Sequence, residues 1–401
     1  MKTKTIKVDY KSSELFSVLH PVLAGKMNLA RIKFLVFFLC ALTKVQTVCF
    51  SSLANGFEIG SKSSSSLRRI QRFMASYVLD LDLIASFIFK MLPHLAPYHL
   101  ALDRTNWMNG EFNINILVLS IMYDGVSFPI LFTMLDKRGN SNTTERIALM
   151  ERYINLFGKE TIKALLADRE FVGKDWIKYL NTKKITYYIR IRENFLITDP
   201  KTRKQIDVVR QFAHVGLNEF HITTRKYLIC EQACYLTASR VINKHGKPEL
   251  QVIISYSKPN QALNAYKERW QIETAFRALK SSGFNIEDSH LTDLDRFAKL
   301  LSIVMLAFAW AFVAGVYKNN NIQAIRILKH GYRAKSFVKY GLEEIQNVFL
   351  NPFCRAKFDI FKFLSCSYNN CYSAFLTPYH SCSLFLILYF LINEINSSLV
   401  R

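Results

Sequence analysis

The order of the elements predicted between residues 98 and 192 constrains the fold more than any other feature of the sequence. Three runs rich in Ile, Leu and Val come first, and helix-like and strand-like segments then alternate. In chain order the predicted elements are strands at Tyr98–Asp103, Asn113–Tyr123 and Ser127–Leu135, a helix at Asn142–Phe157, a strand at Thr161–Ala167, a helix at Lys174–Lys183 and a strand at Thr186–Arg192. The first three strands are predicted to form an antiparallel meander, which places the chain in the mixed α/β class.

This order, βββαβαβ, resembles that of a ribonuclease-H-like core, an α/β sheet in three layers. Such a sheet places its first and fourth strands side by side. Asp103 ends the first predicted strand and Asp168 directly follows the fourth. A single Asp at a strand end is usually a turn or capping residue, but the matched positions of these two predict that their carboxylates meet at one edge of the sheet.

A third carboxylate lies on the helix predicted over Ala265–Lys280, which holds neither Gly nor Pro. At ~100° per residue, Tyr266, Arg269, Glu273 and Lys280 fall on one stripe about 60° wide, beside an apolar face. The stripe alone also fits a solvated charged surface. Three converging carboxylates would repel one another unless cations neutralised them. Two Mg²⁺ ions, with Mn²⁺ as a substitute, would suit such a site and activate a water or a 3′-hydroxyl.

The charge of the chain indicates its partner. The formal net charge is +22, which favours a polyanion, either nucleic acid or an anionic membrane surface. Residues 1–95 are predicted to be all-helical, and Lys44–Phe57 with Ser64–Tyr77 fits a helix-turn-helix-like pair. The second helix carries a basic cluster, which predicts DNA contact or an ordinary charged surface. The cluster consists of Arg68, Arg69 and Arg72.

The stripe on the predicted helix has a recognisable spacing. Tyr266, Arg269, Glu273 and Lys280 match Tyr-x2-Arg-x3-Glu-x6-Lys. This spacing is similar to the signature of the DDE transposases of bacterial insertion-sequence family four, and the segments LALDRTNW and LLADREF supply the two upstream aspartates. The resemblance implies that Asp103, Asp168 and Glu273 are the catalytic, metal-binding triad.

The resemblance also assigns roles to the neighbours of Glu273. It implies that Tyr266, Arg269 and Lys280 hold the DNA backbone next to the scissile bond, by a hydrogen bond, a guanidinium fork and a point charge respectively. It further implies that Trp270 packs around a flipped base near the cut. A part-buried core position is the alternative for Trp270.

The resemblance implies a domain organisation as well. It consists of a helical DNA-binding domain (1–95), the first part of the ribonuclease-H-like core (96–192), a β-rich insertion (193–260), the second part of the core (261–317) and C-terminal helices (318–366). The atypical tail (367–401) departs from the family pattern and reads as an extension by read-through or a fused frame, with a genuine C-terminal membrane or partner helix as the alternative.

The function implied is that of a cut-and-paste transposase. It would bind double-stranded DNA, both the inverted-repeat ends of its own element and the target, as a homodimer on paired ends, with two metal ions and no small-molecule cofactor. Eight scattered cysteines fit the reducing cytoplasm of a bacterium, where the protein would lie at the nucleoid.

Two alternatives come from other classes of protein. The first is a catalytically inactive remnant of a transposase that still binds DNA. The second, less favoured, is a membrane-associated protein built on the apolar runs Leu300–Tyr317 and Leu384–Ile392. Because the first of these runs lies between motifs of a soluble enzyme, we expect it to be a buried core helix.

Overall fold

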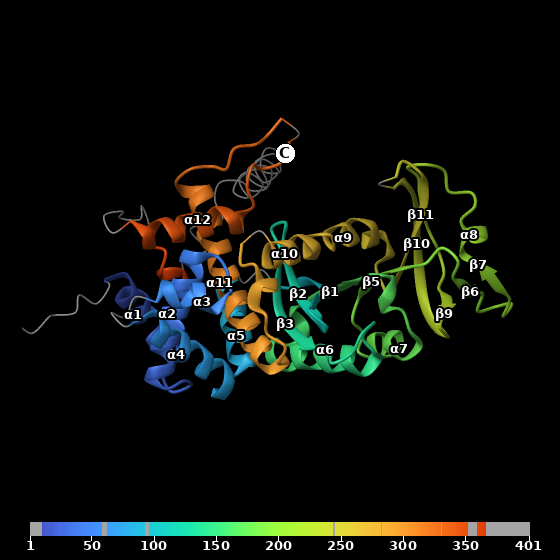
Figure 1. Ribbon diagram of the computed structural model, residues 1–401. Coiled ribbons are helices and arrows are strands. Elements are labelled where there is room, and N and C mark those ends of the chain that lie inside the picture. Colours follow the sequence, from blue (N-terminus) through green and yellow to red (C-terminus); the bar gives the residue numbers. More distant parts are fainter. Residues whose placement is uncertain are drawn as a thin grey trace, which may run out of the picture.

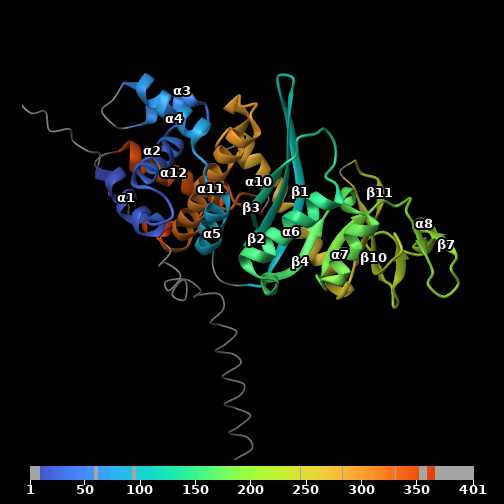
Figure 2. The ribbon, with the colours of Figure 1, turned by 90° about the horizontal axis from the view of Figure 1, so that it is seen from below.

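The computed structural model describes residues 10–57, 62–92, 96–243, 245–281, 283–329, 331–351 and 359–365. Helices gather at one end of the molecule, a large mixed sheet runs through the middle, and short strands form the other end (Figure 1, Figure 2). The predicted α/β class with N-terminal and C-terminal helices is confirmed. The predicted tail at 367–401 lies outside the described residues.

The N-terminal region is helical, as predicted. Its helices are α1 (Tyr10–Leu23), α2 (Leu29–Val45), α3 (Phe50–Gly56), α4 (Ser63–Ser76) and α5 (Leu81–Met91). The buried helix α2 ends at Gln46, whose left-handed backbone (φ 53°) is typical of a helix C-terminus. The predicted helix-turn-helix pair is therefore wrong in its first member, which begins at Phe50 and not at Lys44, because Lys44 still belongs to α2.

The core of the sheet reproduces the predicted order. Its strands are β1 (Tyr98–Asn109), β2 (Phe112–Tyr123), β3 (Val126–Met134), β4 (Ile162–Ala167) and β5 (Tyr187–Ile191). Strands β1, β2 and β3 form the antiparallel meander, while β4 pairs in parallel with both β1 and β5. The first and fourth strands are thus neighbours, which confirms the arrangement on which the two aspartates were predicted to meet.

Strand β1 is longer than predicted. It continues past Asp103 to Asn109 and turns at Gly110 into β2, so that Asp103 is not at its end. The predicted end at Asp103 was wrong, because the run RTNWMN lacks the apolar alternation that indicates a strand. Pairing with the apolar strand β2 holds this run in the sheet. Asp103 lies instead where the parallel partner stops, since Leu102 and Ala167 form the last β1–β4 pair.

Helices cover both faces of this sheet and make three layers. Helices α6 (Thr143–Phe157) and α7 (Lys174–Thr182) lie on one face, and α9 (Ala262–Glu268) and α10 (Gln271–Lys280) on the other (Figure 1). A capping box starts α6, because Asn142 accepts from the Glu145 amide while the Glu145 carboxylate accepts from the Asn142 amide.

The β-rich segment continues the same sheet. It contains β6 (Leu196–Thr198), β7 (Gln205–Asp207), the short helix α8 (Val208–Gln211), β8 (Phe220–Ile222), β9 (Tyr227–Ile229), β10 (Gln232–Ile242) and β11 (Pro248–Ser255). Strand β11 pairs antiparallel with β5, with Ser255 opposite Tyr188, and the sheet then runs on through β10, β9, β6 and β7. The segment is therefore joined to the core by a full ladder of backbone hydrogen bonds.

Helices α11 (Leu294–Asn321) and α12 (Phe337–Leu350) pack closely at the helical end. A Cβ atom on Gly341 would lie 1.8 Å from the Ala311 carbonyl oxygen, so the two backbones touch at this glycine. Among the described residues, α11 has the length and composition of a membrane-spanning helix, as does the bent pair α2–α3, and 89% of the apolar window of α11 is buried in the protein. This burial is what we expected of a core helix.

Candidate active site

The two aspartates lie side by side at the carboxyl ends of the β1–β4 pairing. Each directly follows a residue of the last pair, Leu102 opposite Ala167. Each also accepts a hydrogen bond from the next backbone amide, from Arg104 to Asp103 at 2.8 Å and from Arg169 to Asp168 at 2.7 Å. The carboxyl ends of parallel strands are where open α/β sheets place their sites.

The helix carrying the glutamate is broken next to this edge. We predicted one helix over Ala265–Lys280, but the structure has two, α9 and α10, with Arg269 and Trp270 between them. At the junction the backbone bonds tighten to 3₁₀ spacing, as from the Arg269 amide to the Tyr266 carbonyl at 3.1 Å. Arg269 lies at this junction and is buried, so it does not belong to an exposed surface stripe.

Arg269 bridges two of the three predicted triad members. Its guanidinium donates to Asp103 Oδ2 and to Glu273 Oε1, each at 3.0 Å. The Arg269 side chain is only 10% exposed. Burial lowers the pKa of Arg269, but nearby Tyr266 and the carboxylates raise it more, so the guanidinium stays charged. The Arg269 guanidinium therefore joins Asp103 of β1 to Glu273 of α10, which is far away in the sequence.

The third member, Asp168, is joined to the same helix pair by Tyr266. The Tyr266 hydroxyl donates to Asp168 Oδ1 at 3.4 Å, and the Arg269 guanidinium lies over the Tyr266 ring. Burial raises the pKa of Tyr266 well above its usual value, so the phenol remains a neutral donor. Through these contacts Tyr266 and Arg269 link Asp168, Asp103 and Glu273 in one chain of polar interactions.

The carboxyl of Asp103 has a perturbed pKa. Burial raises the pKa of its carboxyl to about 6, the charge of Arg269 and the Arg104 amide oppose the rise, and Asp168 and Glu170 add to it. Desolvation and repulsion by like charges both act against the ionised form. A perturbed acid at a sheet edge is a mark of a functional site.

The carboxylates are hard oxygen donors of the kind that Mg²⁺ prefers. Within the described part of the chain, no group of three His, Cys, Asp or Glu side chains converges closely enough to hold an ion. Asp103 and Glu273 nevertheless already share one positive charge, that of Arg269. The three carboxylates thus supply suitable oxygen donors, but two of them are paired with Arg269 in this structure.

Lys280 and Trp270 take different positions. Lys280 donates to the Asn106 carbonyl at 3.1 Å, pairs with Glu287 at 3.2 Å and lies over the Trp107 ring, so it fastens α10 to the β1–β2 hairpin. The Trp270 side chain is 62% exposed. The alternative of a part-buried core tryptophan is therefore wrong, and the ring is free to contact a ligand.

The basic cluster of α4 lies apart from these residues. Arg68 and Arg72 are exposed and Arg69 is half-buried. Helix α4 belongs to the helical end of the molecule, away from the sheet edge with the aspartates (Figure 1, Figure 2). The role of the cluster in DNA binding stays a prediction.

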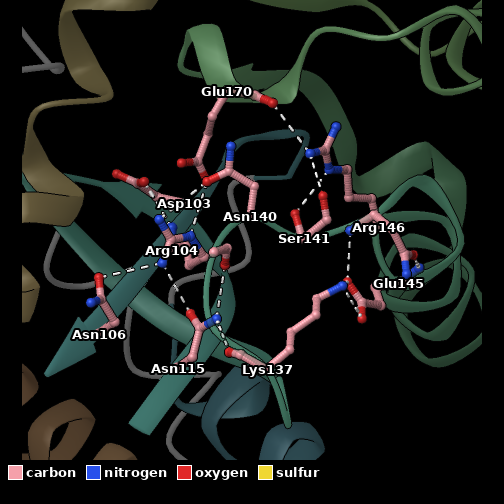
Figure 3. A network of polar contacts seen from close by, with 12 residues as sticks. Asp103, Arg104, Asn106, Asn115, Lys137, Asn140, Ser141, Glu145, Arg146 and Glu170 are labelled. Atoms are coloured by element: carbon pink, nitrogen blue, oxygen red, sulfur yellow. Dashed lines mark hydrogen bonds and ion pairs between the residues drawn. The ribbon is translucent and has the colours of Figure 1, made fainter. Parts of the chain in front are cut away.

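A polar network behind the aspartates was not predicted. Arg104 donates to Asn106 at 3.3 Å, to Asn115 at 3.1 Å and to Asn140 at 3.3 Å, and its Nε lies 3.5 Å from Glu170 Oε1 (Figure 3). Arg104 follows Asp103, and Glu170 belongs to the turn after Asp168. The network thus ties the two strand ends to each other and to the loop before α6.

Arg146 of α6 holds the turn that contains Glu170 by hydrogen bonds. This buried residue donates to the Ser141 hydroxyl at 2.9 Å and carbonyl at 2.6 Å, and to the Glu170 carbonyl at 3.2 Å. Its guanidinium also lies over the Phe171 ring. The closeness of Arg104 and Glu170 to the aspartates was visible in LALDRTNW and LLADREF, but only the fold shows that they interact.

One of three comparisons with known proteins identifies a family for this chain. The family model described as a transposase DDE domain matches residues 95–310. Among solved structures, the chain is similar to the piggyBac transposase in a synaptic complex with hairpin DNA, with 12% identity and a TM-score of 0.42 over 94% of this chain and 82% of that one. The comparison with curated proteins gave no match.

Proposed function

The chain belongs to the transposase DDE domain family, and from this premise we propose that it is the transposase of a bacterial insertion sequence of family four. It cuts DNA at the ends of its element by metal-dependent hydrolysis and joins the freed 3′-OH to target DNA. The observation that supports this most directly is that Tyr266 and Arg269 of the signature contact Asp168, Asp103 and Glu273.

The proposed roles of the residues follow from their chemistry. Asp103, Asp168 and Glu273 would hold two Mg²⁺ or Mn²⁺ ions, which supply positive charge beside the attacking and the leaving oxygen. Tyr266 keeps the Asp168 carboxylate oriented through its neutral hydroxyl. Arg269, once released from the carboxylates, offers its guanidinium fork to a DNA phosphate.

Two further side chains complete the proposed DNA contacts at the cut. Lys280, already at the rim of the site, would add a point charge beside the backbone. Trp270 would present an exposed ring to an unpaired base. The role of Lys280 follows from the signature, and that of Trp270 from the resemblance and from its exposed position directly after Arg269.

The net charge of +22 supports DNA as the partner. We propose that the protein binds the inverted-repeat ends of its element and target DNA as a homodimer, in the bacterial cytoplasm at the nucleoid. The burial of α11 supports a soluble enzyme over the membrane-associated alternative. No small-molecule cofactor belongs to this proposal.

Cleavage of duplexes that carry the element's own ends tests the proposal. The wild type and Asp168→Asn are compared with Mg²⁺, and binding is followed in the same samples by gel shift. We expect the wild type to cut at the element end, and the variant to bind with similar affinity but cut at least 100-fold more slowly, since it loses a charged ligand of the proposed ion.

The other outcomes are as informative. Binding by both proteins without cleavage by either would favour the inactive, DNA-binding remnant. Equal cleavage by both would exclude Asp168 as a metal ligand, and with it the proposed triad.

A further inference from the structure

A polar pocket opens at the residue that directly follows Asp168 of the candidate active site. It has a volume of about 290 Å³ and is lined by three arginines, together with Glu193, Asn194 and Glu249. The arginines are Arg169, Arg190 and Arg192. None of the three has a role in the triad or in the signature, so the proposed function leaves this pocket unassigned.

The pocket lies on the same edge of the sheet as the carboxylates. Arg169 directly follows Asp168 at the end of β4, and Arg192 directly follows β5. Strands β4 and β5 are parallel neighbours, with Ala167 opposite Ile189. Their carboxyl ends therefore point the same way, and a ligand held at Asp168 extends over the pocket.

The three arginines of the pocket differ in whether an acidic partner neutralises them. Arg190 forms a close ion pair with Glu249 across the β5–β11 ladder, which neutralises both. Arg169 and Arg192 are exposed, and in the part of the chain that the structure describes neither side chain has a recorded hydrogen-bond or ion-pair partner. The guanidinium groups of Arg169 and Arg192 thus share the pocket with one further acid, Glu193. The pocket therefore has a net positive charge.

We propose that this site, the Arg169–Arg192 pocket, binds a backbone phosphate of DNA beside the phosphate that is cut. Guanidinium groups grip phosphate oxygens in a planar fork, and Asn194 adds a neutral amide donor. Phosphates of one strand follow every ~3.4 Å along the helix axis, so a neighbour of the scissile phosphate reaches a pocket that begins at the residue after Asp168. The proposal rests on the proposed function, because it takes the ligand to be the DNA that the carboxylates act on.

The salt dependence of binding tests the pocket without any cleavage. The dissociation constant of an end duplex is measured by fluorescence anisotropy in EDTA at several salt concentrations, for wild type and for the double variant Arg169→Gln/Arg192→Gln. Each phosphate contact contributes ~0.9 to the slope of log affinity against log salt. We expect the double variant to lose about 1 from the magnitude of this slope, and Arg169→Lys/Arg192→Lys to recover most of it.

The matched control removes the same charge at the opposite end of β4. Lys159 and Lys163 are exposed there, before and at the start of the strand. We expect Lys159→Gln/Lys163→Gln to keep the wild-type slope. An unchanged slope in the arginine variant, or an equal loss in the lysine variant, would overturn the proposal. Thermal melts of all variants establish that they are folded.

Two reactions then distinguish the strand that supplies the phosphate. If the arginine variant cleaves an uncut element end more slowly, the phosphate in the pocket belongs to the DNA of the element end. If it joins a precut end to a plasmid more slowly, the phosphate belongs to the target DNA. The outcome of the salt-slope test can be told apart from a failure of the proposed function. If the wild type never cuts but the slope still falls in the arginine variant, the transposase is refuted and the pocket is kept only as a site for a DNA phosphate. If the wild type cuts normally and the slopes are equal, the pocket is refuted and the transposase is kept.

Discussion

At the scale of single residues, the candidate site is organised by Arg269. Its sequence spacing to Tyr266 and Glu273 suggested a cation that faces DNA, but in the structure it is turned inward and neutralises Asp103 and Glu273. No pattern within the helix could have predicted this, because the partner Asp103 comes from a strand far away in the chain. The arginine thus acts as an internal counterion in the metal-free protein.

Replacing Arg269 with Gln should destabilise the metal-free protein. Removing one partner of a buried pair costs about 3–5 kcal/mol, and the lower end applies here because Glu273 is 36% exposed. The loss should be smaller at pH 5 than at pH 8, since protonation of Asp103 removes the unpaired charge. Urea unfolding in EDTA at the two pH values measures it.

The control for this substitution is Arg277→Gln, which removes an exposed arginine from the neighbouring helix α10. We expect it to change the free energy of unfolding by no more than ~0.5 kcal/mol. If the two variants were equally stable at pH 8, the bridge by Arg269 would have no energetic importance.

Asp103 should give the metal-free protein a pH-dependent stability. The pKa of its carboxyl is raised to about 6 in the folded protein, from ~3.9 in an unfolded chain. The protonated carboxyl therefore stabilises the fold fully below pH ~4, and this contribution is lost as the pH rises through about 6. The loss is about 3 kcal/mol.

The difference in unfolding free energy between wild type and Asp103→Asn, measured in EDTA from pH 4 to pH 8, isolates this effect. Relative to the variant, the wild type should lose stability between pH 4 and pH 7. A difference that does not change with pH would mean that Asp103 titrates normally.

At the scale of elements, most of the core was predictable from the sequence. Strands β2 to β5 and helices α6 and α7 follow apolar runs, periodicity and capping residues that act locally. The extension of β1 and the break between α9 and α10 were missed, because each depends on a tertiary partner. The meeting of Asp103 with Asp168 needed only the strand order, whereas the network of Arg104 and Glu170 needed the coordinates.

The crossing of α11 and α12 gives a test at this scale. In Gly341→Ala, the new methyl group would lie 1.8 Å from the Ala311 carbonyl oxygen and force the helices apart. Overpacking of this kind costs ~1–3 kcal/mol, against a gain of up to about 1 kcal/mol in helix propensity. We therefore expect a net loss of stability in thermal or urea unfolding.

Gly173→Ala is the matched control, since its Cβ would meet no atom within 4 Å. Its extended backbone (φ 175°) accepts any residue. An equal effect of the two substitutions would show that the helix crossing tolerates a wider spacing than the structure has.

At the scale of the whole molecule, the basic groups lie in separate places. Helix α4, which carries Arg68 and Arg72, belongs to the helical end, whereas strand β5 belongs to the sheet (Figure 1). The Arg169–Arg192 pocket is lined by residues of β5 and of the segments that follow β4 and β5. A duplex bound at the sheet reaches α4 only if it extends along the protein. The length of the DNA should therefore decide whether α4 contributes to binding.

We expect Arg68→Gln/Arg72→Gln to weaken binding of a long duplex, of about 40 base pairs, and to lower its salt slope by about 1–2. Binding of a duplex of about 12 base pairs, centred on the cut, should not change, because α4 lies beyond it. Anisotropy with both lengths measures this, and Lys159→Gln/Lys163→Gln serves as the control. Equal losses with both lengths would place α4 beside the cut, and no loss with either would make the cluster an ordinary charged surface.

The ladder between β5 and β11 has a consequence for how such a chain can change through evolution. With β11 in place, Tyr187, Tyr188 and Ile189 are buried inside a continuous sheet. A descendant that deleted residues 193–260 would bare the flank of β5, and an uncovered, apolar edge strand invites pairing with other chains and aggregation. Loss of β11 would therefore expose the edge of β5, whereas a change in the loops between the outer strands would leave that edge paired.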